Sequence, residues 1–152
     1  MRKIILISVI VFITIAATGI IIQTLETQKT DYKFPGAIEA VKQYLDSWDK
    51  KDWPNMYSVI SDGFKKIEPT AKTLSDFREY AEGQNIENVK ILSLKEESND
   101  GKAAVILYLV EFELKDRTKK EFSDKFTLKY READVIMGWK LIHPYGEKID
   151  TS

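Results

Sequence analysis

Cysteine is absent from the 152 residues, and histidine occurs only once. Without a thiol the chain can form neither a disulfide nor a cysteine-based metal site. Lysine and arginine number 23 against 24 acidic residues, so the formal net charge is −1. Nucleic-acid binding draws on clustered basic residues, and this balance argues against it. The length allows one compact domain, and we expect neither a metal nor a cofactor.

An uncharged apolar segment runs from Ile4 to Ile22. As a helix its 19 residues would span about 28 Å, close to the thickness of a bilayer's hydrocarbon core. Arg2 and Lys3 precede it, so the positive-inside rule keeps the N-terminus cytoplasmic and exports the rest of the chain. We therefore predict a single-pass protein of the cell membrane, with an anchor at residues 1–23, a linker at 24–33, an extracytoplasmic domain at 34–148 and a tail at 149–152.

A cleaved signal peptide is the competing interpretation of the apolar segment. The small residues at 16–19 could loosely supply a cleavage site. However, the apolar run resumes at once with Ile20, Ile21 and Ile22, where a mature protein would begin with polar residues. An uncleaved anchor is therefore the favoured reading, and the absence of cysteine excludes a lipoprotein anchor.

Three segments after the linker have the apolar period of helices. The first opens at Pro35 and Gly36, and its apolar residues recur every three or four positions, at Ile38, Val41, Leu45 and Trp48. The second begins at Asp52, a capping residue, and continues to Gly63. The third begins with a capping box at Thr73 and Asp76 and ends at Gly83.

After Gly83 the apolar period changes from about 3.6 to 2. Strands are expected at Val89–Glu96, at Ala103–Leu114, around Phe122–Arg131 and around Trp139–His143, with turns at 98–101 and 115–118. Helices grouped before strands predict an α+β fold in which the helices pack on one face of a four-stranded antiparallel sheet.

Two local patterns resemble the NTF2-like (nuclear transport factor 2-like) superfamily. One is the segment Ala37–Trp48 followed by Lys50-Lys51-Asp52-Trp53 and Met56-Tyr57, and the other is the closing Gly138-Trp139-Lys140-Leu141-Ile142. Within the superfamily the chain is most similar to small exported versions, including the NTF2-like domain near the N-terminus of MecA-type penicillin-binding proteins. It departs from those proteins by stopping where the transpeptidase part would follow. We also expect no Ser-x-x-Lys nucleophile, so their enzymatic activity is not carried over to this chain.

This resemblance implies a cone with an open mouth, formed by three helices and a curved sheet. Some members of the superfamily use the cone as an active site, while many use it only for binding or as a spacer. The fold alone does not choose among these uses.

Asp124 and His143 are the candidate catalytic pair. If the last two strands form a hairpin near Ala133 and Asp134, Asp124 lies opposite His143, with Leu128 opposite Trp139. Cross-strand neighbours are close enough for a carboxylate to orient an imidazole, and such a pair could act as a general base. The alternative, which we favour, is a structural hydrogen bond at the end of the sheet.

Aromatic side chains are the candidate ligand-binding residues, because aromatic walls can hold an apolar or sugar ligand. They are Tyr44, Trp48, Tyr57, Tyr80, Tyr108 and Trp139. At helical and strand spacing such residues also serve as plain core, and that reading stays open.

Val105, Leu107 and Leu109 fall on the opposite face of their strand from Ile106 and Tyr108. That strand is thus apolar on both faces, which is typical of a partner surface. A homodimer through the sheet face is one expectation, and cover by a terminal segment is the other.

Taken together, these patterns favour a non-catalytic binding or protein-interaction module at the cell envelope. The competing class is a small cone-type hydrolase or isomerase with Asp124 and His143 as its acid-base pair. The identity of the ligand or partner cannot be read from the residues.

Overall fold

Helices precede strands along residues 35–144, the part of the chain that the computed structural model describes. The order of elements is α2 (Ala37–Asp49), α3 (Trp53–Ser58), α4 (Asp62–Ile67), the 3-10 helix η1 (Pro69–Ala71), α5 (Leu74–Gly83), β1 (Ile86–Asn99), β2 (Ala103–Leu114), β3 (Lys119–Arg131) and β4 (Gly138–Leu141). The strands form one antiparallel sheet in the order β1-β2-β3-β4. The predicted α+β class is confirmed.

The predicted membrane anchor at 1–23, the linker at 24–33 and the tail at 149–152 lie outside the described residues. Among residues 35–144, no helix combines the length and the apolar character needed to cross a membrane.

Local capping determines where two of the helices begin. The side chain of Asp52 accepts a hydrogen bond from the backbone N–H of Asn55 at the start of α3. At the start of α5, Thr73 and Asp76 form the reciprocal capping box that the sequence predicts, and the helix ends at Gly83 as expected. These caps satisfy N–H groups that have no partner inside the helix.

The predicted second helix is broken, and this expectation was wrong. Instead of one helix from Asp52 to Gly63, the structure has α3 and α4, and Gly63 lies inside α4. The break occurs where the chain pairs with β4: the N–H of Leu141 donates to the carbonyl of Val59, and the N–H of Ser61 donates to the carbonyl of Leu141. The side chain of Ser61 then caps α4.

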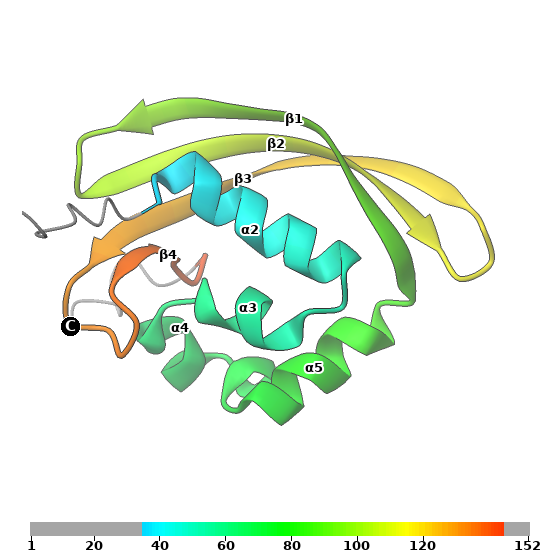
Figure 1. Ribbon diagram of the computed structural model, residues 1–152, viewed down its shortest axis with the longest axis horizontal. Helices are drawn as coiled ribbons and strands as arrows, with labels where there is room; N and C mark the ends of the chain where they lie inside the picture. Colours follow the sequence, from blue (N-terminus) through cyan, green and yellow to red (C-terminus); the bar gives the residue numbers. More distant parts are fainter. Residues whose placement is uncertain (1–34, 145–152) are drawn as a thin grey trace, which may run out of the picture. The chain divides into compact units, whose positions relative to one another are not determined.

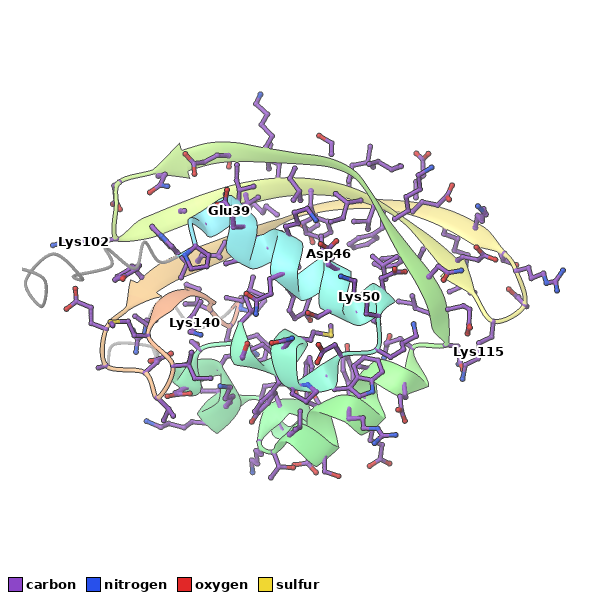
Figure 2. All side chains as sticks on the ribbon, in the orientation of Figure 1. Glu39, Asp46, Lys50, Lys102, Lys115 and Lys140 are labelled. Atoms are coloured by element: carbon purple, nitrogen blue, oxygen red, sulfur yellow. The ribbon has the colours of Figure 1, made fainter. Side chains whose placement is uncertain are left out.

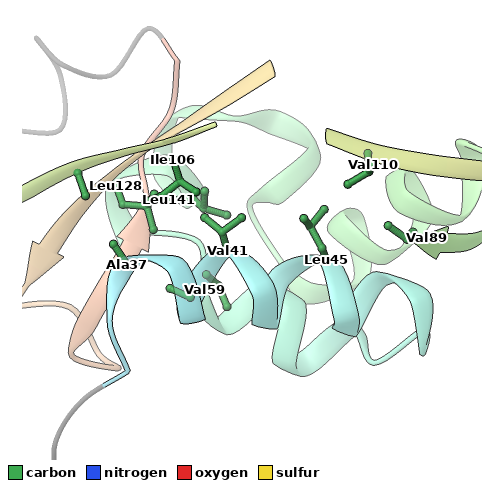
Figure 3. Close-up of a cluster of buried hydrophobic side chains, with 11 residues drawn as sticks. Ala37, Val41, Leu45, Val59, Val89, Ile106, Val110, Leu128 and Leu141 are labelled. Atoms are coloured by element: carbon green, nitrogen blue, oxygen red, sulfur yellow. The ribbon is translucent and has the colours of Figure 1, made fainter. Parts of the chain in front are cut away.

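The core lies between α2 and the concave face of the curved sheet, which α2 crosses (Figure 1). Val41 and Leu45 from α2 pack against buried residues from the strands, namely Ile106, Val110, Leu128 and Leu141 (Figure 3). Phe126 and Trp139 flank this cluster. The apolar stripe of the first predicted helix thus packs on one face of the sheet, as expected.

A second, smaller apolar cluster joins the helices to one another. It is built on Trp53, Met56, Ile60 and Phe77, with Tyr44 and Trp48 packed against it as well as against the main core. The α2 aromatics therefore link the two clusters.

The register of the last hairpin differs from the expected one by two residues. Leu128 pairs with Leu141, and Tyr130 pairs with Trp139. The loop between Arg131 and Gly138 takes up residues 132–137 and replaces the tight hairpin expected near Ala133 and Asp134. Because the shift is even, every side chain keeps its expected face of the sheet.

Candidate functional site

A cavity of about 420 Å³ opens where the helices meet the end of β4. Its aromatic wall comes from four elements and consists of Tyr44 (α2), Phe64 (α4), Phe77 and Tyr80 (α5), and Phe126 (β3). Its size falls within the usual range for small-molecule sites, about 300–1,000 Å³. The cone is therefore open at this end.

Tyr44 places a hydroxyl in this aromatic wall. Its ring meets Phe126 edge-on, with 5.6 Å between ring centroids. Burial raises the pKa of Tyr44 above its ordinary value, and the nearby Tyr80 and Tyr108 add to the effect. Among the described residues the Tyr44 hydroxyl has no hydrogen-bond partner, so its capacity to donate and accept hydrogen bonds is unused within residues 35–144.

Glu68, Thr70 and His143 form a polar corner of the cavity. The Oε1 atom of Glu68 accepts hydrogen bonds from the Thr70 hydroxyl at 2.8 Å and from the Thr70 backbone N–H at 3.2 Å. Its Oε2 atom lies 3.3 Å from Nε2 of His143. We call these three residues the Glu68 corner.

The hydrogen bonds of the Glu68 corner decide the charge state of the carboxylate. The hydroxyl and N–H of Thr70, and then His143, hold the pKa of Glu68 below its ordinary value. The carboxylate is therefore ionised near neutral pH and only accepts hydrogen bonds. Nε2 of His143 must then carry the hydrogen between the two residues. The imidazole ring is buried and meets Phe64 edge-on, with 4.9 Å between ring centroids.

The predicted pairing of Asp124 with His143 is wrong. Asp124 is exposed on β3, where its neighbour on β2 is Tyr108 and where its Oδ1 accepts the N–H of Lys125. Burial raises the pKa of Tyr108 to about 12, and the charge of Asp124 adds to that rise. The observed register of β3 and β4 differs from the predicted one by two residues. The imidazole of His143 faces Glu68, at the start of η1, and this residue supplies the neighbouring carboxylate.

Two of the six predicted ligand-binding aromatics, Tyr44 and Tyr80, line the cavity. The hydroxyl of Tyr57 donates to the carbonyl of Ala71 at 2.9 Å, while Tyr108 stacks on Phe126 with 4.5 Å between ring centroids. Both thus support the cavity wall from behind. A ligand-binding role for these residues stays a prediction.

The two remaining aromatics, Trp48 and Trp139, lie away from the cavity. Trp48 packs against Phe112, and its buried Nε1 has no hydrogen-bond partner within the described part of the chain. Trp139 meets Tyr130 edge-on and borders a separate hollow next to the β3–β4 loop.

Sequence reasoning missed Glu68, Thr70 and Phe64. Glu68 stands before Pro69, an arrangement typical of a helix start, and its side chain does cap η1. That local signal could have been found. The contact with His143, 75 positions away, depends on how the layers pack and has no local signal.

The outer face of β2 carries the predicted apolar stripe. Val105, Leu107 and Leu109 are half-buried there. The strand neighbours of Leu107 are Lys95 and Lys125, so the stripe is one strand wide at this point. Lysine stems can cover apolar surface of this kind. A homodimer through this face stays a prediction.

A bare Ser-x-x-Lys pattern, the signature of transpeptidase nucleophiles, occurs at Ser47–Lys50. Ser47 is buried at the end of α2, whereas Lys50 is exposed. Among the described residues no hydrogen bond joins the two side chains, so this pattern does not form an activated nucleophile. No cluster of three or more potential metal ligands occurs within residues 35–144.

The model of a family described as the NTF2-like N-terminal transpeptidase domain matches residues 36–147. The chain belongs to this family. The match spans every described element from α2 to β4, so the resemblance noted from the sequence is confirmed. No curated protein matches the chain.

Several solved structures are similar to this NTF2-like domain. One is described as an aromatic ring hydroxylase from Novosphingobium aromaticivorans (15% identity, 68% of this chain and 79% of that one, TM-score 0.48). Another is described as a dehydratase of the NTF2-like family from Streptomyces avermitilis (11% identity, 67% and 86%, TM-score 0.47). A third is a SEC-C motif protein from Rhodopseudomonas palustris (9% identity, 64% and 68%, TM-score 0.46).

Proposed function

We propose that this NTF2-like domain is a non-catalytic binding module, held at the outer surface of the cell membrane by residues 1–23. One observation carries the proposal: the open aromatic cavity with a fixed polar corner. A ligand with a flat apolar body would lie against Tyr44, Phe64 and Phe126. Its hydrogen-bond donor would meet the carboxylate of Glu68, which is already ionised and oriented by Thr70.

The state of the polar corner favours binding over acid-base catalysis. A general base works best when its pKa lies near the operating pH, but the pKa of Glu68 is shifted downward, away from neutrality. Both oxygens of Glu68 also already accept hydrogen bonds. The alternative function, a cone-type hydrolase or isomerase, requires Asp124 to act with His143 as an acid-base pair. In the structure His143 contacts Glu68 instead of Asp124.

Co-purification tests the binding role. The full chain is purified from its own membranes into lipid nanodiscs, and extracted small molecules are identified by mass spectrometry. We expect a compound with an apolar ring system on the wild type and its loss from Tyr80→Ala. Tyr80 lines the cavity yet is 49% exposed, so its removal leaves the fold intact. Leu74→Ala on the same helix, away from the cavity, is the matched control. A preparation that carries nothing beyond the nanodisc lipids, or a compound that Tyr80→Ala retains, contradicts the proposal.

The anchor is tested separately from the ligand. With Arg2 and Lys3 on the cytoplasmic side, the chain should stay in the membrane pellet after alkaline carbonate washing, and external protease should digest residues 35–144 on spheroplasts. Release by carbonate, or protection from external protease, would show that the segment Ile4–Ile22 does not anchor an exported domain.

A further inference from the structure

Three consecutive apolar side chains are exposed on the loop between β3 and β4. Val135 is 91% exposed, Ile136 54% and Met137 42%. Scattered single apolar residues are normal on a protein surface, but a contiguous group marks a contact site. We call Val135-Ile136-Met137 the apolar loop tip.

The apolar loop tip is held in place by buried charges at its base. Asp134, whose side chain is 4% exposed, pairs with Arg131 at 3.2 Å and accepts the backbone N–H of Asp62 at 3.0 Å. The carboxylate of Asp62 in turn accepts the N–H of Val135 at 2.8 Å. The base of the loop is thus fixed, and the tip is presented to solvent at little further entropic cost on binding.

The apolar loop tip lies at the end of the domain where α2 begins. The β3–β4 loop, the start of α2 and the β1–β2 turn are all at one end of the long axis (Figure 1). Lys102 marks this end, and Lys115 marks the opposite one (Figure 2). Twelve residues separate Ile22 from Pro35, and they can reach at most about 40 Å when extended. An anchored domain therefore stays close to the bilayer.

Groups that suit a lipid-water interface line a hollow that begins at residues 132 and 133 of the same loop. The hollow is lined by Lys102, Lys129 and Arg131 and by the aromatic Tyr130 and Trp139, with Glu132 as the acidic residue among its lining side chains. Arg131 is neutralised by Asp134, which leaves the two lysines against Glu132. Tyrosine and tryptophan favour the interface, and lysines are attracted to anionic headgroups.

From this combination we infer that the apolar loop tip inserts into the outer surface of the bilayer that holds the anchor, with Lys102 and Lys129 over anionic headgroups. The inference rests on the membrane anchor proposed above. Insertion of a short apolar element reaches about 5–10 Å, to the boundary between headgroups and acyl chains. Insertion of the tip would orient the domain so that the end with Lys102 faces the membrane. Lys115 and the β2–β3 turn would then point away from the membrane.

Depth-dependent quenching tests this orientation, and the absence of cysteine makes every introduced thiol unique. The full chain carrying Ile136→Cys is labelled with an environment-sensitive dye and reconstituted into vesicles of phosphatidylethanolamine and phosphatidylglycerol with brominated acyl chains. Val135→Cys is a second label on the tip, and Lys115→Cys at the far end is the control. We expect quenching of the tip labels to exceed that at position 115 by about threefold or more, as insertion to acyl-chain depth requires.

Each other outcome overturns the inference in a recognisable way. Equal quenching at positions 115 and 136 in floated vesicles excludes the orientation but leaves the anchor standing. A blue-shifted tip dye that brominated lipid does not quench, with a shift that grows with protein density, assigns the tip to a second copy of the chain. Failure of the chain to float with the vesicles rejects the anchor itself and the inference with it.

Discussion

Asp62 and Asp134 hold each other's backbone: Asp134 accepts the N–H of Asp62 at 3.0 Å, and Asp62 accepts the N–H of Val135, the residue after Asp134, at 2.8 Å. This reciprocal pair joins the start of α4 to the β3–β4 loop. Lys65 at 3.1 Å and Arg131 at 3.2 Å balance the two negative charges. The pair thereby fixes the β3–β4 loop at Asp134 and Val135.

Removal of Asp134 should destabilise the domain. Asp134→Ala removes the ion pair with Arg131 at 3.2 Å and the acceptor of the Asp62 N–H, and breaking such a buried pair costs about 3 kcal/mol of unfolding free energy. Urea unfolding of the full chain in non-ionic detergent, followed by tryptophan fluorescence, measures the loss. Glu132→Ala, an exposed position in the same loop, is the control and should change stability by less than about 0.5 kcal/mol. Equal stability of the two variants would show that the pair does not hold the loop.

The ionised side chain of Asp62 should make the free energy of unfolding decrease in acid. Partial burial alone would raise its pKa, but the N–H of Val135 and the ammonium of Lys65 outweigh burial and lower the pKa below its ordinary 3.8. The unfolded chain therefore binds the proton more tightly, so the contribution of Asp62 is complete above about pH 5 and is lost as the pH falls below 3.8. Unfolding curves at several pH values should show the wild type and Asp62→Asn converging in acid. A constant difference would contradict the prediction.

The capping box of α5 should contribute measurably to stability. In Thr73→Ala the N–H of Asp76 loses its acceptor, and the side chain of Asp76 loses the Thr73 hydroxyl. Loss of such a cap costs about 1 kcal/mol. Ser75→Ala, an exposed position inside the same helix, should have little effect or a slightly stabilising one. The comparison uses the shift in urea midpoint at constant m-value.

Tyr44 offers a way to separate ligand binding from stability. Its hydroxyl has no hydrogen-bond partner among residues 35–144, so Tyr44→Phe removes a polar group that is not satisfied within the fold. Stability should stay the same or rise slightly. Retention of the co-purified compound should fall, because the ligand loses a partner in the cavity wall. A variant that loses stability, or that retains the compound in full, shows that the hydroxyl does not face a ligand.

The parts of the fold with strong local signals could be predicted from sequence. The bounds expected for the second strand, Ala103–Leu114, are those of β2, because turn residues stand on both sides of a run in which every even-numbered residue is apolar. The Asp52 cap and the Thr73–Asp76 box were equally local. The face that each strand turns inward also followed from the period of two.

The errors share a different cause, which is contact between distant segments. The second helix is broken because β4, about 80 residues later, supplies better partners for Val59 and Ser61 than another helical turn would. The hairpin register was misplaced because residues 132–137 carry no turn signal and are fixed instead by Asp62. His143 was given the wrong carboxylate for the same reason: Glu68 reaches it across the layers, not along the sheet.

The bridge between Ile60 and Leu141 has a consequence for how the domain opens. The backbone N–H groups of Ser61 and Leu141 donate two hydrogen bonds that join the helical layer to the sheet. The helical layer and the sheet cannot separate while these two hydrogen bonds remain formed. In deuterated solvent the two amides should therefore exchange together, and only when the helical and strand layers separate as a whole.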